Sequence, residues 1–525
     1  MPFSDTHILS TILFTPLVGA LVLFFLPRER PDLQRWIANA FALLGLAVAL
    51  PLVWRFRSGP AAPQFQFLAD RVWIPTLDVH FRVGLDGLSL LLVLLTVLLG
   101  AVAILSSWRA VHTREREYYI SLLLLQTALL GIFLSLDFIL FYVFWELALV
   151  PAYLLIGVWG GERRLHAAIK FFLYTLAGSV VMLLAILAVY HARGTFDIRE
   201  ILSHPFSATD GWRLEKWLFW GFFFAFAIKV PMFPFHTWLP DALTEAPTAA
   251  SVVIAGALLT TGTYGFLRFS VPMLPHAAFH YRGFLVALSL IAILYGALVC
   301  LMQQDLKRLI AYSTIGQMGF CTLGIFALTP LGFYGGIIQQ INLGISSAAF
   351  FLLAGILHRR RRSRQISDFG GLAAPMPNFA AIYTIVTLGA LGMPLLDGFI
   401  GEFSVLRGAY EVHWIWAAFG LLGITLTAAY FLWLYQRIVF GEAASPANSA
   451  HETPRDLDAR EFATLIPLVL LIVWIGVYPQ PIFRALHAPV ARLVEAVHPA
   501  SYRAAPLPVP LAAPPPAPAP RPESK

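Results

Sequence analysis

The chain has 525 residues, of which 58% are hydrophobic and 12% are charged, with a formal net charge of +7. Soluble domains carry about 25% charged residues, so this composition excludes a soluble domain and predicts an all-α polytopic membrane protein. The basic residues lie mostly between apolar segments, as membrane anchors do, and do not suggest nucleic-acid binding. Cys300 and Cys321 form no CxxC pair, and no glycine-rich nucleotide loop or HExxH pattern occurs, so no metal or cofactor site is expected in this chain.

Long apolar segments predict about fourteen transmembrane helices within residues 1–498. A polar loop is expected after the second span, up to about Arg82. The Pro/Ala-rich residues 499–525 cannot bury a core and are expected to be disordered. Residues 1–7 contain no lysine or arginine, which favours a retained first helix over a cleaved signal peptide. The expected spans are 8–26, 36–54, 85–106, 119–136, 138–159, 167–190, a broken seventh over 217–247, 248–269, 284–302, 309–328, 333–357, a broken twelfth over 379–406, 415–435 and 463–477.

Lysine and arginine in the short loops predict which helix ends face the cytoplasm. The loop after the eleventh span reads HRRRRSR, and the loops after the first, third, fifth and ninth spans are also basic. All these loops follow odd-numbered spans and therefore lie on one side of the membrane, which is expected to be the cytoplasm. Both termini are then on the non-cytoplasmic side. The longer loops after even-numbered spans also contain arginines, but long loops count less in this rule.

The seventh span combines a lysine with several prolines, since Lys229 is followed by Pro231, Pro234 and Pro240. A charged lysine costs roughly 2.5–3.5 kcal/mol in a membrane helix, and an interior proline about 3 kcal/mol more. Broken membrane helices persist where the freed backbone lines a water-filled cavity or is covered by protein. The pattern predicts a discontinuous helix with a titratable group at the break. The alternative is an interfacial lysine that extends to the headgroups.

The twelfth span is interrupted in the same way, in the stretch LGALGMPLLDGFIGEF. The two broken spans are five apart, and an odd offset inverts the second copy relative to the first. This spacing predicts two inverted five-helix repeats, at about 118–270 and 283–437.

Three ionisable residues inside the spans are the strongest site candidates. Glu146 lies in the middle of the fifth span, Lys229 at the seventh break and Glu402 after the twelfth break. A lone intramembrane carboxyl is costly unless it is paired or faces water. At a separation of about 6 Å and an effective dielectric constant of about 20, Glu146 and Lys229 would attract each other by roughly 3 kcal/mol. The alternatives are a purely structural pair for Glu146 and a water-facing helix end for Glu402.

Further candidates have equally plausible structural roles. Lys307 and Lys170 lie near basic loops and could be simple anchors. Asp137 could only cap the fifth span. His236 lies beside the break and could relay protons near neutral pH, or only bond the freed carbonyls there.

Five sequence blocks together indicate a known family. They are SLDFILFYVFWELALVPAYLLIGVWGG, HAAIKFFLYTLAGS, FAFAIKVPMFPFHTWLPDALTEAPTAAS, DLKRLIAYSTIGQMGF and DGFIGEF. The blocks resemble the antiporter-like subunits of respiratory complex I, and the resemblance covers nearly all of residues 80–480. It implies fourteen helices with two inverted repeats and a proton channel driven by quinone reduction elsewhere in the complex. On the family pattern, Glu146, Lys229 and Glu402 are the fifth-, seventh- and twelfth-helix residues of that channel.

The resemblance also implies partners and a location. NADH, FMN, iron–sulfur clusters and quinone are expected in partner subunits, and antiporter-like neighbours of the L and N type are expected in the bilayer of a bacterial inner membrane. The L and N branches, like the chains of multi-subunit sodium/proton antiporters, typically carry lysine where this chain has Glu402. That difference favours a complex I subunit over the alternative, a subunit of a cation/proton antiporter. A passive scaffold is disfavoured by the buried charges.

The sequence departs from the family pattern at two positions. The family usually has a lysine in the eighth helix, where this chain has Thr260 in AGALLTTGTYG, and some members have histidine in place of Gln317. Gly256, Thr260 and Thr263 are spaced to share one helix face, which could hold ordered water. Thr260 is therefore expected to be part of the proton path as a hydroxyl that both donates and accepts. The alternative is that Thr260 only bonds back to the carbonyl of Gly256.

Overall fold

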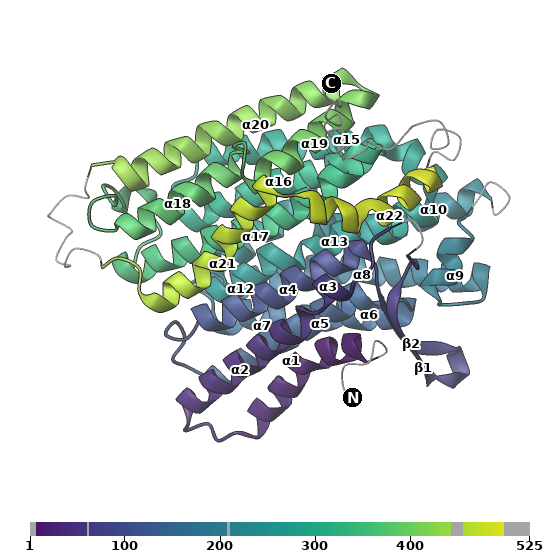
Figure 1. Cartoon of the computed structure of the whole chain (residues 1–525), viewed down its shortest axis with the longest axis horizontal. Coiled ribbons are helices and arrows are strands. Elements are labelled where there is room, and N and C mark those ends of the chain that lie inside the picture. Colours follow the sequence, from purple (N-terminus) through teal and green to yellow (C-terminus); the bar gives the residue numbers. More distant parts are fainter. Residues whose placement is uncertain (1–6, 60–61, 207–210, 443–454, 498–525) are drawn as a thin grey trace, which may run out of the picture.

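The computed structural model describes residues 7–59, 62–206, 211–442 and 455–497. In these ranges long helices run side by side along the longest axis of the molecule (Figure 1). Twelve helical segments in the described ranges are long and apolar enough to cross a membrane. The tail 499–525, predicted to be disordered, lies outside the described residues.

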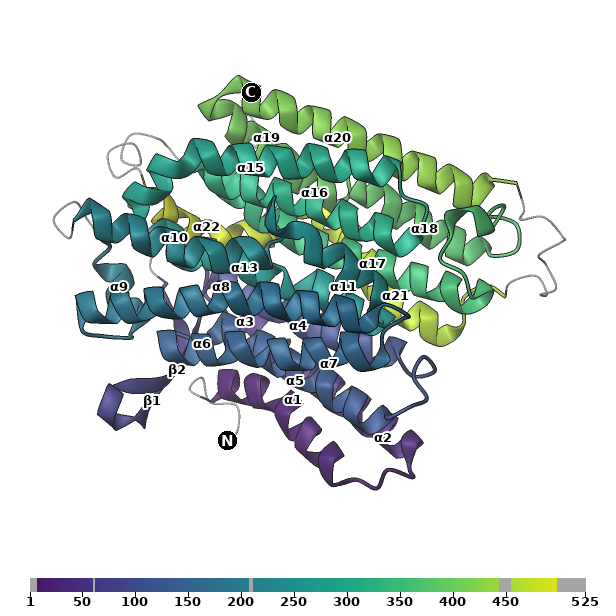
Figure 2. The ribbon, with the colours of Figure 1, turned by 180° about the vertical axis from the view of Figure 1, so that it is seen from behind.

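The N-terminal helices form one edge of the bundle, opposite α20 (Figures 1 and 2). The polar loop expected before Arg82 is instead an antiparallel β-hairpin, whose two strands pair from Gln66–Leu85 to Ile74–Val79. Asp78, in the left-handed region at φ 52°, closes the turn. Apolar and polar residues do not alternate over QFLADRVWI, so the two-residue period typical of a half-buried strand is missing. The elements are α1 (Ile8–Phe25), α2 (Pro31–Ala49), α3 (Leu52–Arg55), β1 (Gln66–Ile74), η1 (Pro75–Leu77), β2 (Val79–Leu85) and α4 (Gly87–Ser106).

The fifth predicted span is divided into two helices directly after the candidate glutamate. Asp137 caps the first helix by accepting the N–H groups of Ile139 and Leu140. The division falls at Ala148, because Pro151 has no N–H for the carbonyl of Leu147. The elements are α5 (Glu115–Leu134), α6 (Phe138–Leu147), α7 (Leu149–Trp159), α8 (Arg164–Arg193) and α9 (Ile198–Ser203).

The predicted seventh and eighth spans are irregular. α10 ends at Lys229, and the chain resumes a helix only after the turn η3. The indole N–H of Trp238 donates to the freed carbonyl of Ile228 at 2.9 Å, so a side chain replaces a helix hydrogen bond there. The eighth contains two π-helical segments, η4 and η5. The elements are α10 (Trp212–Lys229), η3 (Phe235–Thr237), α11 (Trp238–Glu245), α12 (Thr248–Val253), η4 (Ile254–Leu258), α13 (Thr260–Gly265), η5 (Phe266–Ser270) and α14 (Val271–Met273).

Burial differs strongly among the remaining helices. In α17, 94% of the apolar window is buried, against 28% in α20, so α17 is central and α20 lies at the edge (Figure 2). A helix that was not predicted, α22, crosses the bundle after α21 (Figure 1). The elements are α15 (Pro275–Leu301), α16 (Leu306–Ala327), α17 (Pro330–Arg361), η6 (Ile366–Asp368), α18 (Pro377–Ala390), α19 (Asp397–Val412), α20 (Trp414–Tyr435), η7 (Gln436–Phe440), α21 (Ala459–Val477) and α22 (Gln480–Val497).

Two isolated backbone bridges have the same hydrogen-bond pattern in different halves of the chain. One joins Asp137 to Asp197, and the other joins Asp305 to Gln365. In the first, the N–H groups of residues 138 and 198 donate to the carbonyls of residues 196 and 136, both at 3.0 Å. In the second, residues 306 and 366 donate to residues 364 and 304, both at 2.8 Å. Asp137 and Asp305 each also cap the helix that follows.

Candidate functional site

Lys229 is a buried cation at the end of α10. Its side chain is 1% exposed, and its Nζ lies 4.7 Å from the centroid of the Trp145 ring. Within the described chain Nζ makes no hydrogen bond. A lysine in this setting is stabilised mainly by the π face of the indole and by distant charge.

Glu146 supplies that charge from α6. Its electrostatic interaction reaches Lys229, but no ion pair within 4 Å joins the two residues in the described ranges. The Oε1 atom of Glu146 is buried and likewise lacks a hydrogen-bond partner there. The predicted partners therefore interact electrostatically, without a direct ion pair in the described ranges.

Lys170 and His236 lie on the other side of the break. Lys170 Nζ forms an ion pair with Asp241 of α11 at 2.7 Å, so Lys170 has a fixed partner rather than a lipid headgroup. His236 is 4% exposed, stacks on Phe233 at 5.6 Å and meets the edge of Tyr295 at 4.9 Å. The His236 Nδ1 atom has no hydrogen-bond partner among the described residues.

Thr260 lies between the two π-helical segments and is fully buried. Its hydroxyl donates to the carbonyl of Ala257 at 2.8 Å, one residue away from the Gly256 carbonyl considered above. The neighbouring Thr263 hydroxyl donates to Oε1 of Gln340 on α17. The hydroxyl groups of α13 thus meet a carboxamide of the central helix.

Glu402 belongs to a chain of amide side chains on the other side of α17. Its Oε1 accepts the Gln317 amide at 3.3 Å, and Gln317 Oε1 accepts the Gln339 amide at 2.8 Å. Glu402 is 3% exposed and lines a cavity of about 20 Å³, enough for one water molecule. Gln340 and Gln339 of α17 thus contact α13 and α16 respectively. The Gln340 Nε2 atom makes no hydrogen bond within the described residues.

Lys307 lies at the C-terminal end of α11. Its Nζ donates to the carbonyl of Ala246 at 2.8 Å, and its side chain is buried. Arg364 lies 3.7 Å from Glu245, which also accepts the backbone N–H of Arg163. Cations at a helix C-terminus are favoured by its dipole. Lys307 and Glu245 together bring three loops that were predicted to be cytoplasmic to the end of α11.

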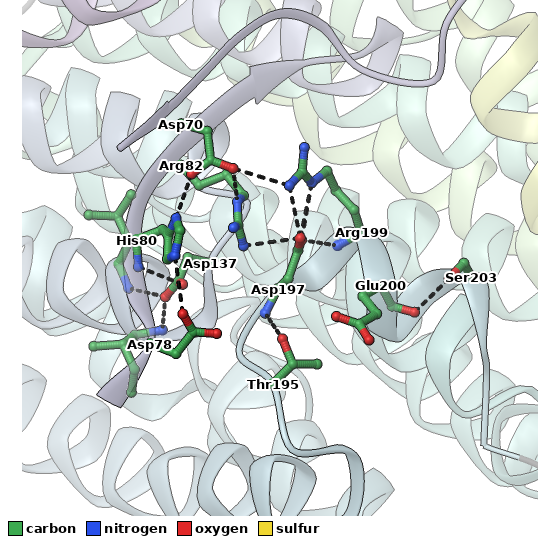
Figure 3. A network of polar contacts seen from close by, with 12 residues as sticks. Asp70, Asp78, His80, Arg82, Asp137, Thr195, Asp197, Arg199, Glu200 and Ser203 are labelled. Carbon is green, nitrogen blue, oxygen red and sulfur yellow. Dashed lines mark hydrogen bonds and ion pairs between the residues drawn. The ribbon is translucent and has the colours of Figure 1, made fainter. Parts of the chain in front are cut away.

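A second charged network joins the β-hairpin to α6 and α9 (Figure 3). Asp137 Oδ2 accepts the backbone N–H of His80 at 3.2 Å in addition to capping α6. The hydrogen bond to Asp70 raises the pKa of the His80 imidazole. Burial alone would raise the pKa of Asp70, but hydrogen bonds from Arg82 and His80 hold it below its usual range. The members are Asp70, His80, Arg82, Asp137, Asp197 and Arg199.

Several buried polar residues were not singled out from the sequence. Gln339 and Asn342 line the same cavity as Glu402, and their signal was a group of amides in the apolar stretch QQINLG. Asp397 interacts electrostatically with Glu402. The buried ion pair between Asp86 and Arg268, at 2.6 Å, was also not predicted. Asp86 also caps α4 by accepting the N–H of Ser89, and Arg268 lies 182 residues away in the sequence.

Comparisons with known proteins show the family and the fold that this chain shares. The family model for the membrane domain of NADH:quinone oxidoreductase and the Mrp antiporter matches residues 135–427. The chain is 43% identical over 505 residues to NADH-quinone oxidoreductase subunit M of Rhodobacter capsulatus, covering 94% of this chain and 97% of that protein. It is similar to a chain of respiratory complex I from Thermus thermophilus with bound NADH, with 33% identity, a TM-score of 0.83 and coverage of 93% and 99%. It is also similar to a chain of the Mrp complex from Dietzia sp., with 25% identity and a TM-score of 0.79, covering 94% of this chain and 52% of that chain.

Proposed function

Because the chain belongs to the NADH:quinone oxidoreductase/Mrp antiporter family of membrane subunits, we propose that protons cross it through the polar side chains between α6 and α19. The chain is a subunit M-like, membrane-arm subunit of proton-translocating complex I, an enzyme of the translocase class. NADH, FMN, iron–sulfur clusters and quinone are carried by partner subunits, so the contribution of this chain is proton transfer.

The observation that carries the proposed path is the buried, unbonded ammonium of Lys229 facing Glu146. A structural ion pair is held by direct hydrogen bonds, whereas a proton carrier must change its charge. Lys229 accepts and releases the proton, Glu146 stabilises the charged form, and His236 lies at the break as a further acceptor. Lys170, Lys307 and Asp137 hold the helix ends that position this group.

The second half of the path ends at Glu402. The hydrogen bonds from Gln339 to Gln317 and from Gln317 to Glu402 provide a polar connection through the apolar interior. The amides do not carry the proton themselves. They line the cavity of about 20 Å³ beside Glu402, which has room for a water molecule that can carry it. Here Gln317 and Thr260 take positions where the family often has titratable residues.

We further propose that α10 with α11, and α18 with α19, each cross the membrane once. This adds two discontinuous helices to the twelve apolar spans and gives about fourteen crossings in two inverted repeats. The matching backbone bridges support this arrangement. The span Phe138–Trp159 begins at the first bridge and leads to the loop that contacts α11 near the second. Its 22 residues extend about 33 Å, so the bridges lie on opposite membrane surfaces.

The sidedness of the chain is proposed from the same geometry. The basic loops after α7, α15 and α17 gather at the end of α11, and we place that surface in the cytoplasm of a bacterial cell. Both ends of the chain then lie on the opposite side. Antiporter-like subunits of the L and N type are the proposed neighbours in the membrane arm.

A cysteine introduced at Ser363, in the arginine-rich loop after α17, is expected to stay unlabelled by an impermeant maleimide in intact cells. Cys300 and Cys321 are buried and give a low background. A cysteine at the exposed Arg71 of the hairpin is the matched control and should be labelled. Labelling at Ser363 from outside, with Arg71 unlabelled, would invert the proposed orientation.

Thr260→Val is expected to lower the number of protons moved per NADH oxidised. Valine keeps the shape of threonine but removes the hydroxyl that donates to Ala257. Thr261→Val is the matched control, because the buried Thr261 makes the same kind of bond to Leu258. If Thr260→Val and Thr261→Val both pump at the unmodified ratio, Thr260 contributes only to helix packing, and the central relay lies elsewhere.

The proposed path is tested by Glu402→Gln in the complete complex, reconstituted in vesicles. The proton-to-NADH ratio is expected to fall by the share that this subunit moves, because glutamine cannot bind and release the proton. Glu411→Gln, on the same helix but partly exposed, should leave the ratio unchanged. A full ratio in Glu402→Gln would remove Glu402 from the path.

The antiporter alternative instead requires sodium-dependent proton movement without NADH, and the lower identity to the Mrp complex makes it the weaker candidate.

A further inference from the structure

The start of α19 contains a second buried carboxyl group that the proposed path does not use. Asp397 is the first residue of α19 and is 0% exposed. Its Oδ1 accepts the backbone N–H of Gly398 at 2.9 Å, whereas Oδ2 has no hydrogen-bond partner within the described ranges. An ionised carboxyl in this position would be a buried charge with an unsatisfied oxygen, which is strongly unfavourable.

Asn342 on α17 shows that a donor is missing beside Asp397. Its Nδ2 donates to the main-chain carbonyl of Asp397 at 2.7 Å. Its own Oδ1 is buried and receives no hydrogen bond from any described residue. Two adjacent residues therefore each present an acceptor without a donor. A proton on Asp397 converts one of these acceptors into a donor.

Asp397 shares its surroundings with Glu402. The two carboxyl groups interact electrostatically, and they lie on the first turns of the same helix. Gly392, at φ +69° in the break, lies against Glu402, because a Cβ at Gly392 would collide with Glu402 Oε2. Gly398, the neighbour of Asp397, also packs on Gly392, since a Cβ at Gly398 would lie 3.3 Å from the Gly392 Cα. The cavity of about 20 Å³ is lined by Glu402, Asn342 and Gly398, and it has room for one bridging water.

The helices packed against α19 bring no opposing charge to this pair. They are α16, α17, α18, α20 and α21. The titratable group that they turn toward Glu402 is the phenol of Tyr430 on α20. Within residues 7–59, 62–206, 211–442 and 455–497, no cationic side chain forms an ion pair with either carboxyl. Two buried carboxyl groups that interact without a cation between them do not readily ionise together.

We propose that Asp397 is a second proton-binding carboxyl, paired with Glu402, so that the start of α19 stores and exchanges protons as one unit. In the exchange, the O–H bond of Glu402 breaks and an O–H bond forms at Asp397, with water as the proposed carrier between them. The negative charge moves the opposite way, and no electrons are transferred. The role of Asp397 rests on the proposed function of Glu402.

The test compares complete complexes that carry Asp397→Asn, Glu402→Gln or both, reconstituted in vesicles, with the proton-to-NADH ratio as the readout. Asp397→Asn is expected to lower the ratio to the value of Glu402→Gln. The double variant is expected to be no lower, because the two groups act as a unit. Asp397→Glu, which keeps a carboxyl, should recover most of the ratio. Glu411→Gln on the same helix should match the unmodified complex.

The outcomes separate the two proposals. A lowered ratio in Glu402→Gln with a full ratio in Asp397→Asn overturns the pairing and leaves the path intact. A full ratio in Glu402→Gln overturns the path itself. Additive losses in the double variant also overturn the pairing.

If Asp397→Asn fails to assemble, the test uses infrared difference spectra, recorded with and without NADH, of the unmodified complex and of Asp397→Glu. The carbonyl band of a protonated carboxyl group that responds to NADH is expected at a different frequency in the two complexes. An unshifted band overturns the proposal.

Discussion

Complex I that carries Glu146→Gln is expected to assemble fully, but the proton flux through this subunit is expected to fall about a hundredfold. Glutamine preserves the shape of the side chain, but it removes the negative charge that acts on Lys229. At a separation of about 6 Å that attraction is roughly 3 kcal/mol, which corresponds to about two orders of magnitude in rate. The measurement is the NADH-driven pH gradient in reconstituted vesicles, with NADH oxidation recorded in parallel.

Glu162→Gln is the control for the loss of one glutamate. Glu162 is exposed in the loop between α7 and α8, so its loss should leave the pH gradient unchanged. If Glu146→Gln oxidises NADH and acidifies the vesicles like the unmodified complex, the charge on Glu146 is not needed. Glu146 would then be a packing residue of α6.

Lys229→Ala is expected to be at least as damaging as Glu146→Gln, and Lys229→Arg should fail as well. Alanine removes the proton carrier. Arginine keeps the positive charge but does not release its proton in proteins, so a fixed charge would stand where a changing one is required. The same vesicle assay measures the effect, and the amount of assembled complex is measured separately, because Lys229 packs on Trp145.

The control for the arginine substitution lies on the same helix. Lys216 is exposed near the start of α10, and Lys216→Arg should pump normally. The informative contrast is between the two arginine variants. Normal pumping by Lys229→Arg would mean that Lys229 acts as a permanent charge. The proton carrier near the break after α10 would then have to be sought at His236.

The intramembrane charges show how far sequence reasoning reaches. Glu146, Lys229 and Glu402 stand out because an ionisable residue in an apolar span is rare and costly. The partner of Lys170 could not be read in the same way, since Asp241 lies in a separate segment and only the fold brings them to 2.7 Å. The hydrogen bond of Lys307 to the end of α11 was equally hidden, because it depends on how the loops meet.

The β-hairpin and the buried carboxyl group of Asp397 are features that the sequence did not predict. The strands Gln66–Ile74 and Val79–Leu85 are short, and a polar stretch between two long spans is easily read as a loop. Asp397 precedes a glycine at a helix start, where aspartate is ordinary. Only the packing of α17 against α19 shows that its carboxyl is buried without a partner.

Sequence alone determined the membrane character of this protein, most of its spans and the residues whose charge is exceptional there. The reason is physical: the bilayer imposes a length and an apolar composition on each helix, and every departure is visible locally. Tertiary structure decided which polar groups meet. The connection from Thr263 through α17 to Glu402 joins residues from four helices, and such contacts depend on how the helices are packed rather than on any single segment.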